Sequence, residues 1–240
     1  MDAIRIEGLT KKYKGIVAVD HLDLKIEEGK LFALLGINGA GKTTLIKMLA
    51  CLTQPNSGDA FLHNKSIMSN RQEVKDLISI SPQETAIAPN LSVRENLDLM
   101  CGINRFSKQK TGQKIKETVS QFALAPVLDK RAGKLSGGWR RRLSIAMALI
   151  SEPKILFLDE PTLGLDVMAR SELWNTIKNL KNKMTIILTT HYMEEAEALS
   201  DQVGIMKAGK LLALGSVHDL KVLANTTDFE QAFITIVKGG

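Results

Sequence analysis

Glycines, a lysine and two threonines follow one another closely in one segment, Gly36-Ile37-Asn38-Gly39-Ala40-Gly41-Lys42-Thr43-Thr44. The spacing is that of a phosphate-binding loop, in which a glycine and four further residues precede Gly-Lys-Ser/Thr. Glycines let successive backbone N–H groups turn toward a phosphate chain, and a helix that begins here adds partial positive charge. Lys42 is placed to reach the β- and γ-phosphates of a nucleotide, Thr43 to bind Mg²⁺ and Thr44 to add a phosphate contact.

A second segment combines an apolar run with two acids, Ile155-Leu156-Phe157-Leu158-Asp159-Glu160. An apolar strand that ends in aspartate can place a carboxylate beside a phosphate loop, where Asp159 would hold Mg²⁺ directly or through water. Glu160 projects in another direction and could polarise an attacking water. The two segments together indicate a site that binds and hydrolyses a nucleoside triphosphate.

A third segment, Leu135-Ser136-Gly137-Gly138, comes just before a basic stretch with a helical pattern. A serine and two glycines at the start of a helix can bind an anion, although the same residues alone could be an ordinary helix cap.

The elements around these motifs alternate between strand and helix patterns. Residues 31–36, 155–159 and 184–190 are strand-length apolar runs, as expected for strands covered on both faces. A helix is expected from Gly41 to Cys51, with Leu52 continuing its apolar face. Two short, half-exposed strands are expected within the first thirty residues. Residues 84–151 have a helical character, and Ser92 and Glu95 have the spacing of a capping box.

We therefore expect one domain over residues 1–240, with residues 1–83 and 152–240 forming an α/β core and residues 84–151 a helical insertion.

The composition fits a globular chain with a core, since 44% of the 240 residues are hydrophobic and 24% are charged. The net charge of +6 is compatible with phosphate or an anionic membrane nearby, and equally with solvated lysines. Cys51 and Cys101 lack metal-ligand spacing, and Cys51 is expected in the core. The longest apolar runs are too short to span a membrane.

In combination and in this order, the motifs resemble the nucleotide-binding domain of ABC transporters over essentially the whole chain. Residues 36–44 are similar to the Walker A loop, Asp159 and Glu160 to the Walker B pair, and residues 135–138 to the ABC signature. Four further positions match: Tyr13 resembles the aromatic residue that stacks on adenine, Gln83 the Q-loop glutamine, residues 163–166 the D-loop, and His191 the switch histidine.

The resemblance implies an α/β fold: a P-loop NTPase core with a mostly parallel sheet, an N-terminal antiparallel β subdomain and an inserted helical subdomain. It also implies that two such domains associate head to tail around two MgATP. Glu160 would be the general base, His191 would contact the γ-phosphate, and Gln83 would sense Mg²⁺ beside Thr43 and Asp159. Ser136, Gly137 and Gly138 would then close over the nucleotide bound by the partner, and Asp166 of the D-loop would also contact nucleotide.

Two positions depart from the family pattern, because Trp139 stands where Gln is usual and the D-loop begins Leu-Gly rather than Ser-Ala. The segments around residues 164–174, 190–201 and 228–240 resemble the bacterial drug, antibiotic and sodium export branch.

The expected partners are a second ABC ATPase, either another copy or a paralogue, and a separate integral-membrane permease; no nucleic acid is expected. The chain would be cytoplasmic and peripheral on the inner face of the membrane. A soluble ABC factor that acts on ribosomes or DNA is a weaker alternative, because the chain has one motif set and no heptad insertion. A P-loop kinase or GTPase is disfavoured by the signature and by Glu160.

Overall fold

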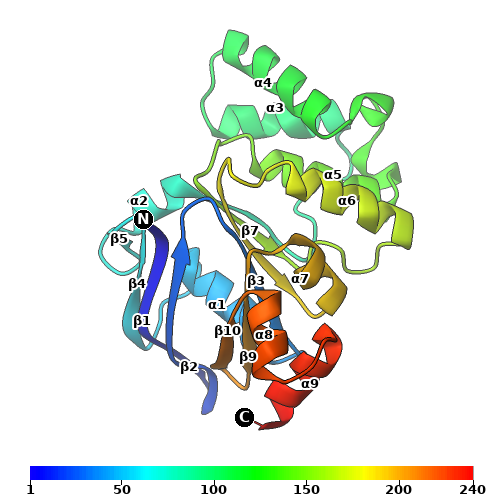
Figure 1. Ribbon diagram of the computed structural model, residues 1–240. Coiled ribbons are helices and arrows are strands. Elements are labelled where there is room, and N and C mark those ends of the chain that lie inside the picture. The colour runs from blue at the N-terminus through cyan, green and yellow to red at the C-terminus, as the bar shows by residue number, and fades with distance from the viewer. Residues whose placement is uncertain (240) are drawn as a thin grey trace.

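The computed structural model describes residues 1–239, which form two β-sheets with helices packed between and around them (Figure 1). The first sheet is antiparallel, with the strand order β2-β1-β4-β5. Its strands are β1 (Asp2–Tyr13), β2 (Ile16–Glu27), β4 (Ser57–Leu62) and β5 (Lys65–Ser66). The antiparallel N-terminal sheet is as predicted, but β1 and β2 have 12 residues each, so the expectation of short strands was wrong. Bulges along β1 interrupt the regular alternation from which strand length is judged.

The second sheet has the strand order β10-β9-β3-β8-β7-β6, and all its pairs are parallel except β9 with β10. Its strands are β3 (Leu31–Gly36), β6 (Ile78–Ser81), β7 (Ile155–Asp159), β8 (Thr185–Thr190), β9 (Gln202–Lys207) and β10 (Lys210–Gly215). The three central strands β3, β8 and β7 are buried along their whole length. Their continuous apolar runs reflect cover on both faces of a parallel sheet.

The two faces of β7 show how the sheet joins the rest of the chain. Ile155 and Phe157 point to one side, where they pack with helix α1 (Lys42–Leu49) and the antiparallel sheet. Leu156 and Leu158 point to the other side, into the core shared with the long helices. Strand residues alternate between faces, so a single five-residue strand ties both layers to the site at its end.

Helix α1 is shorter than predicted, because it ends at Leu49 rather than Cys51. Cys51 has a left-handed backbone with φ 57° and turns the chain away, while its side chain is buried as expected. Leu52, predicted on the apolar face of this helix, lies outside it and is 64% exposed.

The segment between β6 and β7 contains only helices and turns among its regular elements. The helices are α3 (Val93–Ile103), α4 (Lys108–Gln121) and α5 (Gly137–Ala148), with 3-10 turns η1 (Ala125–Val127) and η2 (Ala132–Lys134). Ser92 and Glu95 form the predicted capping box at the start of α3. Leu97, Phe122 and Leu143 pack into one core with Leu156 and Leu188 of the sheet, so this helical layer rests on the sheet face opposite to α1.

The remaining helices are α2 (Arg71–Leu77), α6 (Val167–Lys178), α7 (Met193–Leu199), α8 (Val217–Leu223) and α9 (Phe229–Gly239). Helices α8 and α9 pack with α7 against β3 and β9, near the C-terminal end of the described chain (Figure 1). The seven-residue helices α2 and α8 were not predicted, since two turns carry too little periodicity to stand out. No helix within residues 1–239 is long and apolar enough to cross a lipid bilayer.

Candidate active site

The glycine-rich segment connects the carboxyl end of β3 to the start of α1, as the sequence predicts. Gly39 and Gly41 have left-handed φ angles of 81° and 105°. A Cβ atom at Gly41 would collide with the carbonyl oxygen of Ala18 on β2, so only glycine fits there. This close approach presses the loop against the antiparallel sheet and turns it into one wall of a cavity.

The cavity has a volume of about 480 Å³ and brings most of the predicted site residues together. From the loop and α1 it is lined by residues 38–44, and from elsewhere by Ile16, Val17, Ala18, Gln83, Glu160, Leu163 and His191. Gly36 and Ile37 line a neighbouring hollow of about 330 Å³ that also contacts His191 and Asn38.

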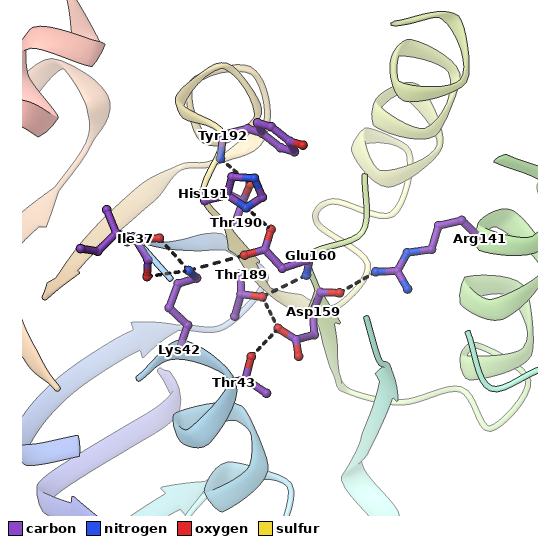
Figure 2. A network of polar contacts seen from close by, with 11 residues as sticks. Ile37, Lys42, Thr43, Arg141, Asp159, Glu160, Thr189, Thr190, His191 and Tyr192 are labelled. Atoms are coloured by element: carbon purple, nitrogen blue, oxygen red, sulfur yellow. Dashed lines mark hydrogen bonds and ion pairs between the residues drawn. The ribbon is translucent and has the colours of Figure 1, made fainter. Parts of the chain in front are cut away.

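Lys42 lies between the loop and the acidic strand end. Its side chain is 7% exposed, and its ammonium group donates a 2.6 Å hydrogen bond to the carbonyl oxygen of Gly36. The same ammonium group is 3.5 Å from Oε1 of Glu160 (Figure 2). The one cation of the loop therefore faces the cavity beside the carboxylate that was predicted to orient water.

The predicted Mg²⁺ ligands also meet. The Thr43 hydroxyl donates a 3.3 Å hydrogen bond to Oδ1 of Asp159, which is 6% exposed at the end of β7. Gln83 is exposed and lines the same cavity, two residues beyond the end of β6. A hydroxyl, a carboxylate and an amide oxygen are hard oxygen donors of the kind that Mg²⁺ prefers, so the residues fit this ion.

Glu160 is held in an unusual backbone conformation. Its φ of 48° is left-handed, which is uncommon for a residue with a Cβ atom. Its N–H group donates to Thr189, at 3.1 Å to the carbonyl oxygen and 3.0 Å to the hydroxyl. Nδ1 of His191 lies 2.8 Å from Oε2 of Glu160. The strained backbone thus aims the carboxylate at both Lys42 and His191, and strain of this kind gathers at functional sites.

Thr189 is a site residue that the sequence reasoning missed. Its hydroxyl donates to Oδ1 of Asp159 and accepts from the N–H of Glu160, so one buried side chain on β8 fixes both neighbouring acids (Figure 2). The available signal was a pair of threonines at the end of an apolar strand, just before His191.

Three sets of predicted residues are not brought to the cavity within one chain. Tyr13 is 43% exposed and does not line the cavity, although its strand partner Ile16 does. Ser136, Gly137 and Gly138 lie at the start of α5, and Gly137 lines a separate hollow of about 420 Å³. Asp166 caps α6 by accepting a 2.9 Å hydrogen bond from the N–H of Ala169. Ser136 and Asp166 are both exposed.

Trp139, the unusual residue after the signature glycines, has a packing role. Its ring is partly buried against the core of the helical layer. The guanidinium of Arg142 stacks 4.8 Å from the ring centre, and Arg142 also pairs with Glu172 of α6. The tryptophan therefore stabilises the α5–α6 contact and leaves Ser136 and Gly137 exposed.

The model of the ABC transporter family matches residues 19–163, which is more than half of the chain. The chain belongs to the ABC transporter family. The predicted ATPase activity is confirmed by this membership, and ATP with Mg²⁺ is the cofactor of this ABC-type ATPase domain.

Relatives of very different length share this domain. The chain is 41% identical over 226 residues to human ATP-binding cassette sub-family A member 2, covering 92% of this chain but 9% of that protein. It is 37% identical over 220 residues to the daunorubicin resistance ATP-binding protein DrrA3 of Streptomyces coeruleorubidus, covering 91% of this chain and 70% of that protein. The second match places the chain near the drug export branch of the family.

A solved structure of the ATP-binding cassette MJ0796, a dimer bound to ADP and phosphate after hydrolysis, has the same fold. It superposes with a TM-score of 0.79 at 25% sequence identity, covering 89% of this chain and 98% of that one.

The position of Thr189 leads to a first prediction. Thr189→Val keeps the shape of the side chain but removes the hydroxyl that fixes Asp159 and Glu160. ATP hydrolysis should slow about tenfold or more, because a hydrogen bond to a charged group is worth about 1.5–3 kcal/mol. Thr185→Val is the matched control on the same buried strand, where the hydroxyl accepts from the N–H of Gly29. Equal activity losses in the two folded variants, measured as kcat, would show that the Thr189 hydroxyl has no special role.

Proposed function

We propose that the chain is the motor of a drug-export type ABC transporter, that it works as a head-to-tail dimer around two MgATP, and that it drives a separate membrane permease. The observation that supports the dimer is that the signature motif lies apart from the phosphate loop and the acids within one chain. Ser136 is exposed at the start of α5 and lies outside the cavity that holds Lys42 and Glu160. A second copy, turned head to tail, would close each cavity with the Ser136–Gly138 segment of its partner.

The surface near the site supports such a dimer. Leu163 is 41% exposed, and Val167 and Met168 at the start of α6 are 76% and 71% exposed. Ile37 in the phosphate loop is 52% exposed. Exposed apolar side chains thus lie both in the phosphate loop and at the start of α6, and such side chains favour burial against another molecule. The dimer seen for MJ0796 provides a related precedent.

Within each site, the geometry supports distinct roles. Lys42 and the backbone N–H groups of residues 38–44 would bind the phosphates, while Thr43, Asp159 and Gln83 would hold Mg²⁺. The ion would neutralise developing charge on the phosphate oxygens. Glu160 would take a proton from the attacking water. His191, hydrogen-bonded to Glu160, would hold that carboxylate in place and contact the γ-phosphate.

The drug-export part of the proposal is supported by the likeness to DrrA3, whose name records daunorubicin resistance. The coupling surface would be the segment 84–91, which follows Gln83 and leads to the helical layer. Ala86 is exposed in this segment, whereas Ile87 packs against the helical core. The proposed location is the cytoplasmic face of the membrane, where the segment would receive a short amphipathic helix of the permease. The resemblance gives no reason to expect a nucleic-acid partner.

The role of Glu160 is tested by Glu160→Gln, which keeps the size of the side chain but removes the base. Hydrolysis should slow about 10²–10⁴-fold, the usual contribution of general-base catalysis, while MgATP binding is retained. Glu152→Gln is a matched control, because Glu152 also has a left-handed backbone, with φ 55°, but lies at the surface and pairs with Lys114. Normal turnover in Glu160→Gln, with binding followed by calorimetry, would rule out this residue as the base.

The coupling surface is tested by Ala86→Glu, which adds a charge without disturbing the core. The variant should bind MgATP normally but no longer co-purify with membranes of the source cell, because the charge opposes docking of an apolar helix face. Ala125→Glu, at another exposed alanine of the helical segment, is the control and should co-purify like the unmodified chain. Undiminished membrane binding of Ala86→Glu would place the coupling surface elsewhere. If the unmodified chain never associates with a membrane protein, the transporter proposal fails and a soluble ABC factor replaces it.

A further inference from the structure

We propose that Arg141 is a positioning residue that ties the Gln83 loop and the strand end carrying Asp159 and Glu160 to helix α5. It would thereby link the occupancy of one nucleotide site to the placement of Ser136. The inference rests on the proposed function in so far as Ser136 serves the partner's nucleotide.

The guanidinium of Arg141 is a hub of backbone contacts. The residue lies in the second turn of α5 and is 4% exposed. Nε donates a 2.8 Å hydrogen bond to the carbonyl oxygen of Pro161, and Nη2 donates a 2.6 Å bond to that of Asp159. Nη1 donates to the carbonyl oxygen of Pro82 and, at 3.4 Å, to that of Gln83. Figure 2 shows Arg141 reaching Asp159 from the side opposite to Lys42.

These bonds join three parts of the site that the sequence places far apart. Pro82 and Gln83 follow β6, Asp159 ends β7 with Pro161 in the turn just after it, and Arg141 belongs to the helix that begins just after Ser136. One rigid, planar group therefore holds the loop of a proposed Mg²⁺ ligand and the turn of the proposed base to the same helix. A shift of either loop would be passed to α5, five residues from Ser136.

The chemistry of the contact requires arginine. All four acceptors are carbonyl oxygens spread around the guanidinium plane, which matches the fork of fixed N–H donors in arginine but not the single ammonium of lysine. Among residues 1–239 no carboxylate forms an ion pair with Arg141. Burial lowers the pKa of Arg141 to about 10, while Asp159, Glu195 and Glu160 act in the opposite direction, so the group stays charged at neutral pH.

A buried cation without a paired acid is costly compared with an apolar side chain of similar size. Packing alone would not require a charge at this position in the second turn of α5. The hollow of about 420 Å³ at the start of α5 is lined by Gln83, Gly137, Arg141, Glu160 and Leu163. The guanidinium therefore lies where the loops of the proposed site and helix α5 meet. The cost of burying this charge is explained by its role, because the guanidinium fixes two loops relative to helix α5.

The test is a comparison of Arg141→Gln, Arg141→Lys and the control Arg71→Gln in the purified full chain. Arg71 also donates to a backbone carbonyl, that of Cys51 at 2.8 Å, but on α2 and outside the cavity. Arg141→Gln should lower kcat about tenfold or more while the KM for MgATP changes less than about threefold, since misplacement of catalytic groups affects turnover more than binding. Arg141→Lys should recover part of kcat. Arg71→Gln should leave both constants unchanged.

A kcat of folded Arg141→Gln within about twofold of the unmodified chain would overturn the proposal. A parallel loss in kcat and affinity that follows the loss of thermal stability would do the same, because it would show a purely structural role. If Arg141→Gln does not fold, Arg141→Lys decides: a kcat equal to that of the unmodified chain overturns the proposal, and a reduced kcat at unchanged KM supports it.

A second measurement, that of MgATP-driven dimerisation, distinguishes a failure of the Arg141 proposal from a failure of the proposed dimer. In the Glu160→Gln background, adding Arg141→Gln should leave MgATP binding intact but weaken MgATP-driven dimerisation about tenfold or more. If Arg141→Gln does not weaken dimerisation, the link to Ser136 is wrong. If Glu160→Gln alone never dimerises, the proposed dimer fails, whereas the kcat and KM values still decide whether Arg141 positions the two loops.

Discussion

The register of three parallel strands is the constraint on which the site depends. Leu35 of β3 pairs with Thr190 of β8, and Thr189 of β8 pairs with Asp159 of β7. Parallel strands that end at one edge deliver the phosphate loop, the two acids and His191 to the same place. A shift of one residue along β8 would turn the Thr189 hydroxyl away from Asp159, because successive side chains point to opposite faces. The geometry of the proposed site and the packing of the core are thus set by the same hydrogen bonds.

The site concentrates features that an ordinary core avoids. Glu160 has a left-handed backbone, Lys42 and Glu160 are buried together, and Arg141 brings a further charge behind the acids. Glu195 on α7 is fully buried too; its burial raises the pKa of its carboxyl, which accepts a hydrogen bond from the Trp174 indole. Burying these groups costs stability, and the continuous apolar cores on both faces of the sheet offset that cost. In return, their dipoles and charges are fixed before a substrate arrives, which favours catalysis.

The sequence predicts best the features that depend on residues adjacent in the chain. The phosphate loop, the acids after β7, the buried central strands and the capping box of Ser92 follow from local spacing and local patterns. Arg141 and the cavity wall formed by Ile16 and Val17 could not be found this way, and for Thr189 the local pattern indicates a strand end but not the contacts with both acids. Their importance arises from contacts between segments far apart in the chain. The lengths of β1 and β2 and the short helices α2 and α8 were missed because bulges and two-turn helices leave little periodic signal.

In the proposed dimer, one chain supplies only part of each nucleotide site. The most direct measurement is the molar mass of Glu160→Gln in MgATP by light scattering, with and without Ser136→Arg. Glu160→Gln should have twice the chain mass of 26.4 kDa. The double variant should bind MgATP with the same affinity but keep the mass of a single chain, because a large cation at exposed Ser136 prevents α5 from closing over the partner's nucleotide. Equal dimerisation of both proteins would show that Ser136 does not close the partner's site, and a Glu160→Gln chain that stays single in MgATP would rule out the dimer.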